Sequence, residues 1–447
     1  GPAAGMSARI TSIAGSAVNL DTPLVQPTQS DAFAIRGVIS NIFGSYYEKT
    51  NVFPSTEVRP GADGVMSVYM RPGGRLTALM DNHTSPSYLV LTGTYELSFW
   101  AKGTAANQRV QFQLNRWNWG VTYVFNQTFT LTTEWKYYAI TNTVTTDPNG
   151  TNIKLTMASY NSGAFWLDDV SLKRIIPETR TIYTRMAEVA LTNAGFGGIR
   201  HWMGQLGDSL DNLVASRAGQ KPTQDNVWGS GYYPTMPEFF TIAEELGQKS
   251  AWMVLPVVLS TNEGMNLIEF LAGPTNTPYG AIRAQRGHPA PWTDGLVIYL
   301  ELGNEVWSYQ NGPPYARMIT QLFGAMRSSP YFNSDRMKLV MGGQSGNNWR
   351  ADNSVPQAKY YDAYDNAGYT MGTYDTASTN TDDTFGPLMA FHDSQYSGSF
   401  GYQRDLLISD GRGKQFTIYE MNMHTTGGGA AETIRNMMVT SVGAAVA

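Results

Sequence analysis

The sequence predicts a protein of two domains, an antiparallel β-sandwich over residues 3–176 followed by a (β/α)8 barrel over residues 177–447. Its 447 residues suit two or three domains, because one domain takes roughly 150 residues. Short alternating strands dominate up to about residue 176, whereas strands alternate with helices after Pro177. The second part has 447 − 176 = 271 residues, close to the roughly 250 of such a barrel. Gly1-Pro2 look like the scar of a tag-removing protease and are assigned to neither domain.

In the first part of the chain, segments rich in β-branched and aromatic residues predict the strands of a sandwich. Clusters of Gly, Asn, Pro and Asp, such as residues 146–150, separate these segments and indicate turns. Many short strands with such turns are typical of antiparallel sandwiches. The expected strands are 94–101, 109–115, 128–132, 135–140, 153–158 and 164–172.

The second part alternates expected strands with expected helices, which favours parallel β/α units. Thr235 and Glu238 have the spacing of a capping box, so a helix should begin there and end before Gly247. The expected helices are 181–193, 235–246, 266–272, 314–327 and 431–446. The expected strands are 197–202, 251–259, 296–302, 338–342, 369–374 and 416–421.

Six expected strands fall short of the eight that a closed barrel needs. Either the barrel is incomplete because the chain is cut short at Ala447, or strands have been missed. A doubly wound sheet is the competing architecture, but no glycine-rich dinucleotide loop follows an early strand.

Composition excludes several classes of function. The net charge is −5 and no Lys/Arg cluster occurs, so we expect no nucleic-acid partner. The longest apolar run, residues 251–259, is much shorter than the roughly 20 residues of a membrane-spanning helix, so we expect a soluble protein without a membrane partner. Cysteine is absent, which removes disulfides and thiolate chemistry. Low charge with abundant Asn, Thr, Gly and Tyr suits a secreted or periplasmic protein that handles neutral polar ligands. The oligomeric state stays open.

Two carboxylates follow apolar strands of the second domain. Glu305 comes after the strand that ends at Leu302, and Glu420 lies near the end of the 416–421 strand. Because the carboxyl ends of barrel strands form the active-site face, both side chains should enter one pocket. Facing carboxylates are what glycoside hydrolysis requires, one as acid and one as nucleophile or base. Asn304 and Trp307 add an amide and an aromatic platform beside Glu305.

Glu301 lies on the same segment and is interpreted differently. Glutamates near strand ends are common, so we interpret Glu301 as a solvated or salt-bridged loop residue. For Glu420 alone, a catalytic role and a role as a solvated or salt-bridged loop residue stay equally open.

The stretch 270–291 running into Tyr299-Leu-Glu-Leu-Gly-Asn-Glu305 resembles glycoside hydrolase family 51. The known activities of that family are mainly α-L-arabinofuranosidase and, in fewer members, endo-β-1,4-glucanase. The resemblance implies a retaining mechanism in which Glu305 is the acid/base and Glu420 the nucleophile. It further implies that Asn304 holds the sugar's 2-hydroxyl and that Arg200 keeps the nucleophile ionised.

The chain departs from the family pattern in three places. Strand two of the family carries Arg-Tyr/Trp-Pro-Gly-Gly, whereas this chain has Arg200-His-Trp-Met-Gly204. Tyr374 is the candidate counterpart of the tyrosine in a His-x-Tyr motif on strand six, and the family's C-terminal β-sandwich has no counterpart. These departures bear on the arabinofuranoside specificity more than on the glycosidase chemistry. His424 is a candidate pocket residue, while His288 is expected to shape a loop.

The segment 109–119 alternates in a way that suggests a sugar-binding face. Val110, Phe112 and Leu114 should form core, which turns Gln111, Gln113, Asn115, Trp117 and Trp119 to the other side. Amides hydrogen-bond hydroxyl groups while indole faces stack on the C–H surface of a sugar. The alternative, in which both tryptophans pack under a loop, stays open.

This first domain resembles carbohydrate-binding modules of the family 4/9 type, in residues 91–102, 132–136 and 165–172. The resemblance implies a jelly roll that often carries a structural calcium, with Asp168 or Asp169 as a ligand. A capping or surface-packing role for this aspartate pair is equally open.

The combined prediction is a retaining glycoside hydrolase for plant-cell-wall-type polysaccharide, with no cofactor for catalysis. Two alternatives stay open, a non-catalytic carbohydrate-binding protein and an inverting hydrolase.

Overall fold

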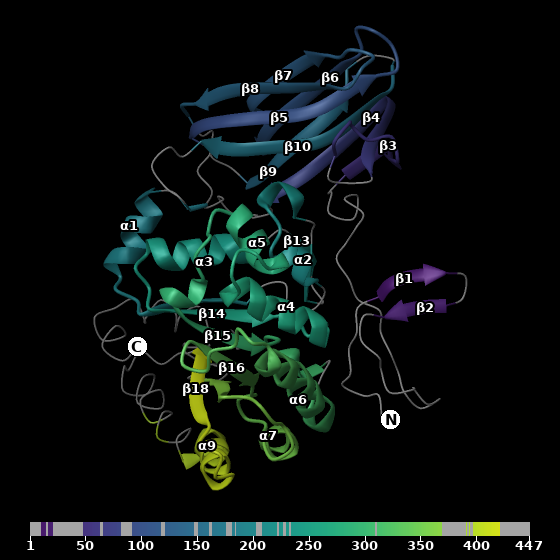
Figure 1. Cartoon of the computed structure of the whole chain (residues 1–447). Coiled ribbons are helices and arrows are strands. Elements are labelled where there is room, and N and C mark those ends of the chain that lie inside the picture. Colours follow the sequence, from purple (N-terminus) through teal and green to yellow (C-terminus); the bar gives the residue numbers. More distant parts are fainter. Residues whose placement is uncertain are drawn as a thin grey trace, which may run out of the picture.

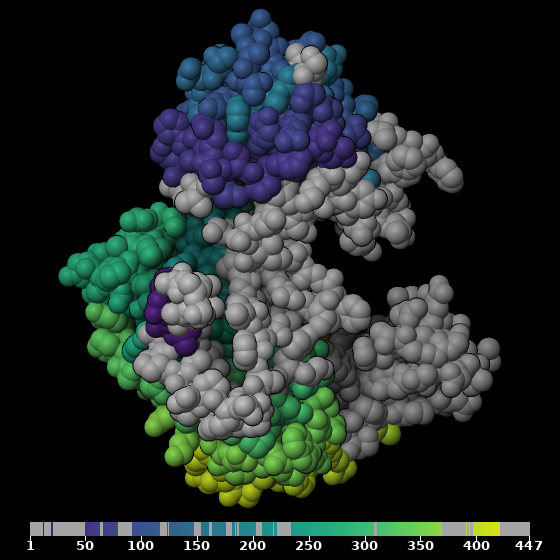
Figure 2. Space-filling model, turned by 90° about the vertical axis from the view of Figure 1, so that its right-hand side faces the viewer, coloured from purple at the N-terminus to yellow at the C-terminus, as the bar shows by residue number. Residues whose placement is uncertain are grey.

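The computed structural model describes residues 10–14, 17–20, 48–62, 66–81, 92–117, 121–146, 151–160, 163–175, 181–183, 185–202, 208–220, 223–226, 229–231, 234–308, 311–368, 390, 393 and 397–420. These residues gather into a body of strands, purple to blue in Figure 2, and an α/β body, green to yellow. The expected boundary at residue 176 lies in a stretch outside the described residues, so the domain limits stay a prediction.

The first body is an antiparallel β structure whose strands pair in the order β7-β6-β9-β4-β10-β5-β8, with β3 beside β4 (Figure 1). Its strands are β3 (Glu48–Ser55), β4 (Ser67–Asp81), β5 (Gly93–Gly103), β6 (Arg109–Trp117), β7 (Val121–Thr130), β8 (Lys136–Val144), β9 (Thr151–Ser159) and β10 (Phe165–Ile175). The sequence analysis missed β3 and β4. A short hairpin of β1 (Ile10–Ala14) and β2 (Ala17–Leu20) stands apart from this sheet.

The long sheet curls into two layers. The rings of Phe99 on β5 and Phe112 on β6 lie 4.5 Å apart, although three other strands separate these two along the sheet. The curl begins in β4, which pairs with β10 before Gly73 and with β9 after it; Gly73 has a φ of +70°, a conformation that glycine adopts readily. The antiparallel sandwich is thus present, whereas its jelly-roll topology stays a prediction. Val110, Phe112 and Leu114 are fully buried between the layers, as expected.

The second body is a six-stranded sheet whose strand order follows the chain, β11-β14-β15-β16-β17-β18, with every pair parallel. A doubly wound sheet would reverse its strand order at a switch point, so this alternative is excluded. Within the described residues, β11 and β18 each have a single neighbour, and the curled sheet corresponds to part of a (β/α)8 barrel. The strands are β11 (Gly198–His201), β14 (Ser250–Leu255), β15 (Val297–Leu302), β16 (Met337–Gly342), β17 (Ala363–Ala367) and β18 (Gln415–Glu420).

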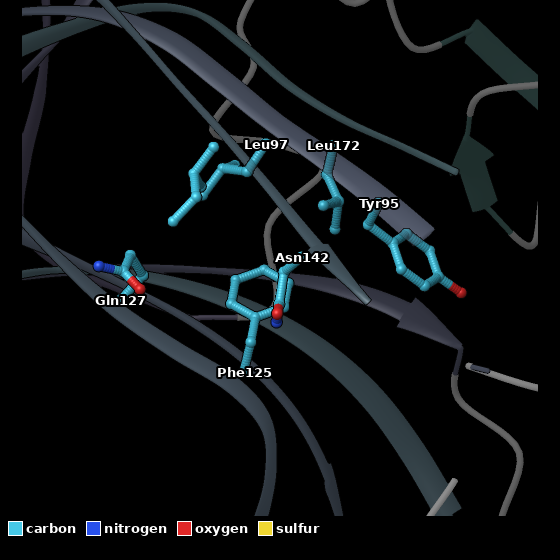
Figure 3. A pocket seen from close by; sticks show the side chains of 7 residues that line it. Tyr95, Leu97, Phe125, Gln127, Asn142 and Leu172 are labelled. Carbon is cyan, nitrogen blue, oxygen red and sulfur yellow. The ribbon is translucent and has the colours of Figure 1, made fainter. Parts of the chain in front are cut away.

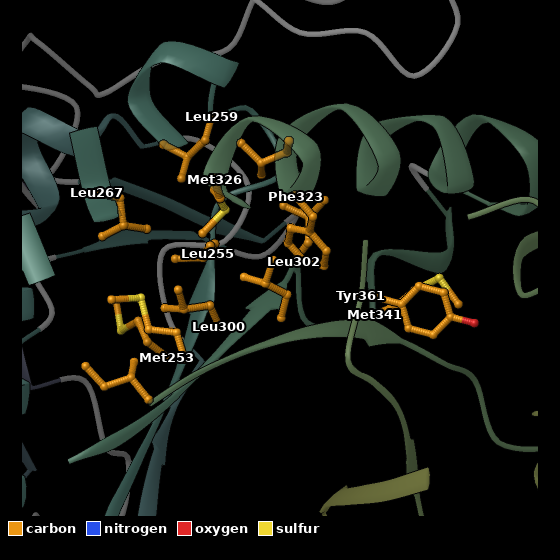
Figure 4. Close-up of a cluster of buried hydrophobic side chains, with 14 of the residues drawn as sticks. Met253, Leu255, Leu259, Leu267, Leu300, Leu302, Phe323, Met326, Met341 and Tyr361 are labelled. Atoms are coloured by element: carbon orange, nitrogen blue, oxygen red, sulfur yellow. The ribbon is translucent and has the colours of Figure 1, made fainter. Parts of the chain in front are cut away.

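Helices cover the outer face of this sheet (Figure 1). Leucine and methionine side chains of β14, β15 and β16 pack there against α4 and α6, forming the cluster of Figure 4. The capping box of Thr235 and Glu238 is present as expected, and a second one at Ser260 and Glu263 starts α4. The helices are α1 (Arg185–Asn193), α2 (Leu210–Leu213), α3 (Met236–Glu245), α4 (Thr261–Ala272), α5 (Pro278–Gln285), α6 (Gly312–Ser328), α7 (Asn348–Ser354) and α9 (Ser399–Ser409). A small hairpin of β12 (Thr223–Asn226) and β13 (Gly229–Gly231) also belongs to this part. None of the described helices has the length and hydropathy that crossing a membrane requires.

The expected strands match the sheet with one exception. The strand β17 lies at Ala363–Ala367, and the expected strand at 369–374 falls outside the described residues, as does the expected helix at 431–446. The sequence analysis missed β17 because Asp365 and Asn366 interrupt its apolar pattern. Both are fully buried: Asp365 Oδ1 accepts from the Gly343 amide while its Oδ2 has no hydrogen-bond partner among the described residues, and Asn366 Nδ2 donates to Gln403.

One buried group of this body makes its stability depend on pH. His201 ends β11 on the helix-covered face, where its ring meets that of Phe239 edge-on at 5.4 Å. Burial lowers the pKa of His201 from 6.5 to about 4. The unfolded chain therefore binds the proton at a higher pH than the folded chain does.

We predict that the unfolding free energy falls by about 3 kcal/mol between pH 7 and pH 4 on account of His201. The sign follows from the lowered pKa: the stability is present above pH 6.5 and is lost as the pH falls toward 4. Urea unfolding at both pH values measures it, and His201→Phe should remove most of this loss. An equal loss in the variant would contradict the assignment.

Candidate active site

The turn after β15 carries Asn304 and Glu305 on an unusual backbone. Gly303 and Glu305 have φ values of +71° and +50°, in the left-handed region that residues other than glycine seldom adopt. A Cβ on Gly303 would lie 2.5 Å from Val257, so no side chain fits there. The turn is held by the Gly303 amide, which donates to the Leu255 carbonyl at 3.0 Å. Strain of this kind clusters at functional sites.

The inner face of the sheet, opposite the helices, collects polar and aromatic side chains. In β14 and β15 the residues next to the buried leucines and methionines point inward, which places Trp252 and Glu301 there. Arg200 of β11 pairs with Trp252 and therefore lies on the same face of the sheet. Trp252 also stacks on Tyr299 with ring centroids 5.1 Å apart. An arginine and a glutamate thus meet on this face.

Arg200 and Glu301 form a bidentate ion pair. The Arg200 Nε donates to Glu301 Oε2 at 3.0 Å, and Nη2 donates to Oε1 at 3.0 Å and to Oε2 at 2.8 Å. Trp252 Nε1 donates to the same Oε2 at 2.8 Å. The side chain of Glu301 is 2% exposed and that of Arg200 14%. Both oxygens of the buried carboxylate are therefore satisfied.

The same guanidinium reaches two further residues. Its Nη2 donates to Asn304 Oδ1 at 2.6 Å, and its Cζ lies 4.6 Å from the ring centroid of Tyr419 on β18. Tyr419 in turn donates its hydroxyl hydrogen to Glu305 Oε1 at 3.1 Å. Arg200 thus connects strand β11 with the turn after β15 and with the end of β18.

A β-bulge sets the side of the sheet on which Glu420 lies. Asn366 pairs with Ile418 and Ala367 with Glu420, so Tyr419 is an extra residue in β18. Paired residues on neighbouring strands share a face, which gives Glu420 the face of Ala367 and Asp365, the inner one. Glu305 and Glu420 are both exposed. The contact of Tyr419 with Glu305 places the backbones of Glu305 and Glu420 at the same edge of the sheet, the one formed by the carboxyl ends of its strands.

Two buried carboxylates lie beneath this edge, Glu301 and Asp365. Burial raises the pKa of Glu301, against the opposing charge and hydrogen bonds of Arg200. Burial also raises the pKa of Asp365 well above its usual range, and the charge of Glu301 adds to the rise. Because Glu301 has the guanidinium in direct contact, we infer that it is the ionised member and Asp365 the protonated one.

The expected site residues divide into three groups. Asn304, Glu305, Glu420 and Arg200 lie on the same edge or inner face, although Arg200 pairs with Glu301 instead of the expected partner Glu420. Glu301 is salt-bridged, one of the two expected possibilities, but it is buried within β15 and does not lie in a loop. Trp307 lies nearby with its Nε1 donating to the Gly343 carbonyl at 3.0 Å, which anchors the indole. His288 shapes a loop as expected: its Nδ1 lies 2.7 Å from the Ala290 carbonyl oxygen and its Nε2 lies 3.1 Å from the Glu244 carboxylate. Tyr374 and His424 lie outside the described residues.

Sequence reasoning missed Tyr419 and Trp252. Tyr419 directly precedes Glu420, so it could have been singled out as a polar group in an otherwise apolar strand end. Trp252 gave no signal, because tryptophan in an apolar strand is ordinarily core.

The expected sugar-binding face of the first body is partly described. Gln111, Gln113 and Asn115 lie on the side of β6 opposite the core and pair with Thr128, Asn126 and Tyr123 of β7. Gln111 Nε2 donates to Asn126 Oδ1 at 2.8 Å. Trp117 ends β6, but its side chain and all of Trp119 lie outside the described residues.

Asp168 and Asp169 contact Arg59. The Arg59 amide donates to Asp168 Oδ2 at 3.3 Å, and its Nε donates to Asp169 Oδ2 at 2.5 Å. Calcium takes six to eight oxygen ligands at roughly 2.3–2.6 Å. The described part of the chain gathers no three His, Cys, Asp or Glu side chains for a metal, and a guanidinium already neutralises Asp169. The contacts with Arg59 are those of a surface-packing role, and a calcium site at this aspartate pair stays a prediction.

A small recess lies in the sandwich, between β5, β8 and β10 on one side and β7 on the other (Figure 3). Leu97, Phe125 and Leu172 form an apolar floor, and Gln127 and Asn142 add amides. None of the residues that line this recess carries a carboxylate.

Two segments of the chain match models of known protein families. Residues 243–384 match the family model described as alpha-L-arabinofuranosidase 1 domain, and residues 48–162 match the model described as carbohydrate binding domain. The chain is 38% identical over 71 residues to a probable alpha-L-arabinofuranosidase A of Emericella nidulans, covering 16% of this chain and 11% of that protein. It is 34% identical over 112 residues to an extracellular exo-alpha-L-arabinofuranosidase of Streptomyces chartreusis, covering 19% and 12%. The matched parts thus span about a tenth of each of these relatives.

Among solved structures, the GH51 arabinofuranosidase of Xanthomonas axonopodis pv. citri aligns with a TM-score of 0.46 at 17% identity, over 56% of this chain and 52% of that one. The matches to family models thus cover two separate segments, and the chain is similar to each family over that segment alone.

Proposed function

We propose that this protein is a retaining glycoside hydrolase that removes α-L-arabinofuranosyl residues from plant polysaccharide. The observation that carries the proposal is the contact of Tyr419 with Glu305, since it brings the residue next to Glu420 onto the other candidate carboxylate. Two carboxylates that flank the scissile bond form the catalytic pair of most glycosidases. Asn304 adds an amide beside Glu305.

In this mechanism Glu305 gives its proton to the leaving oxygen while Glu420 attacks the anomeric carbon. The glycosidic bond breaks, the aglycone leaves as an alcohol, and the sugar is bonded to Glu420 as an ester. Glu305, now a carboxylate, takes a proton from water, and the resulting hydroxide equivalent attacks the anomeric carbon. The sugar leaves with its original anomeric configuration, and both glutamates regain their starting states.

The substrate preference rests on the relatives. The family model that residues 243–384 match and the two named relatives are all described as arabinofuranosidases, which favours an arabinofuranoside over a β-1,4-glucan. One relative is named extracellular, and we propose that this protein also acts outside the cell.

The first body would hold the polysaccharide for the second. Gln111 and Asn115 are partly exposed on the side of β6 opposite the core, where their amides can bond sugar hydroxyls, while Gln113 between them is buried. The match of residues 48–162 to a carbohydrate-binding domain supports this role.

We predict that Glu305→Gln lowers kcat on arabinan by about 10²- to 10⁴-fold, because it removes the proton donor and the later base. On an arabinofuranoside with a nitrophenol leaving group, the first step needs no acid. A burst of nitrophenol followed by slow turnover should therefore appear in stopped-flow absorbance.

The matched control for this variant is Asp362→Asn. Asp362 is paired with Arg327 and accepts from the Leu339 amide, at the opposite end of the strands from Glu305. It should leave kcat unchanged. The enzyme proposal would be refuted if the wild-type protein hydrolysed none of arabinosides, arabinan, arabinoxylan, cellulose and mixed-linkage glucan. A fully active Glu305→Gln variant would refute it as well.

We predict that Gln111→Ala with Asn115→Ala weakens retention by arabinoxylan in affinity electrophoresis about tenfold, because two hydroxyl-bonding amides are lost. Hydrolysis of a small aryl arabinofuranoside should not change. The control is Thr94→Ala with Thr143→Ala, a hydroxyl pair bonded across β5 and β8 on the other sheet layer. Equal retention of both double variants would argue against this face.

A further inference from the structure

The carboxylate of Glu301 has no role in the double displacement, yet it is the most completely bonded group near the site. It lies two strands from β11 and receives three hydrogen bonds from Arg200 and one from Trp252. A bidentate contact of this kind fixes the guanidinium in position as well as in charge. Glu301 therefore determines where each nitrogen of Arg200 lies.

One of these fixed nitrogens determines the orientation of Asn304. Arg200 Nη2 lies 2.6 Å from the Asn304 side chain, and a guanidinium can only donate. The atom of the amide that meets it must be the oxygen, because an NH₂ group in its place would set donor against donor. The Nδ2 of Asn304 is turned away from Arg200 as a result.

The freed amide nitrogen is a donor without a partner among the described residues. Asn304 is half-buried and directly precedes Glu305, which is exposed. A sugar hydroxyl bound beside Glu305 would meet an N–H donor of fixed direction. Such a bond gains strength as charge develops at the anomeric centre.

We propose that Glu301 is a positioning residue that acts through Arg200: it fixes the Asn304 amide so that Nδ2 donates to a substrate hydroxyl next to the scissile bond. This inference rests on the proposed glycosidase function. It assigns Glu301 a function in turnover that a buried ion pair retained for stability alone would not have.

The test is a double-mutant cycle on two substrates. The variants are Glu301→Gln, Asn304→Ala and both together, and the substrates are 4-nitrophenyl α-L-arabinofuranoside and its 2-deoxy analogue. On the full substrate, Glu301→Gln should lower kcat about 10- to 100-fold with a smaller change in KM. In the Asn304→Ala background the same substitution should cost less than about threefold, since the donor is already gone.

The 2-deoxy analogue separates positioning from general damage. Because it lacks the hydroxyl, Glu301→Gln should change its kcat less than about threefold. Asp362→Asn, the substitution of another arginine-paired carboxylate, should change neither substrate. Equal losses on both substrates, or additive losses in the double variant, would overturn the proposal while leaving the enzyme function standing. Absence of wild-type turnover would instead overturn the proposed function.

A second variant decides the matter if Glu301→Gln does not fold, as judged by its melting transition. Arg200→Lys keeps the positive charge that Glu301 requires, but one ammonium cannot reproduce the fork that bonds both Glu301 and Asn304. It should lose activity on the full substrate and retain it on the 2-deoxy analogue. A loss of equal size on both substrates would contradict the positioning function.

Discussion

The ion pair between Arg200 and Glu301 is the constraint on which the rest of the candidate site depends. Removing two charges from water costs several kcal/mol each, and only close geometry with every oxygen bonded offsets that cost. Here three bonds from the guanidinium and one from Trp252 satisfy the carboxylate. The sequential order of parallel strands makes this possible, because β14 alone separates β11 from β15. From this fixed guanidinium, contacts extend to Asn304 and to the ring of Tyr419.

The two candidate catalytic glutamates lie where the regular backbone breaks down. Glu305 has a left-handed φ in the turn after β15, and Glu420 follows the bulge that turns it onto the inner face of β18. The left-handed φ and the bulge both lower local stability, and each changes the direction of a side chain. The regular parts of the α/β body, with buried leucines, methionines and two capping boxes, supply the stability that allows these irregularities. Rigid elements thus support an edge on which the chemistry is concentrated.

Periodicity and strand-end position were enough to predict five of the six strands of the sheet and the placement of Glu305 and Glu420 at strand ends. These features depend on local patterns of apolar residues. By contrast, β17 was missed because Asp365 and Asn366 are polar, and their burial depends on partners from β16 and α9 that no local pattern reveals. The salt bridge of Glu301 was among the expected possibilities, but its burial was missed for the same reason, since its partner Arg200 is distant in sequence. Tyr419 was missed because its hydroxyl contacts Glu305 only in the folded chain, where the end of β18 approaches the turn after β15.

The central claim is that Glu305 and Glu420 meet across one sugar and that Glu420 forms a bond to it. Mass spectrometry of the protein quenched during turnover of 2,4-dinitrophenyl α-L-arabinofuranoside by a Glu305→Gln variant tests this most directly, because the glycosylated form should accumulate. The account requires an added pentosyl group on the peptide that contains Glu420. A pentosyl group on a different carboxylate, or product released with inverted anomeric configuration and no adduct, would contradict it.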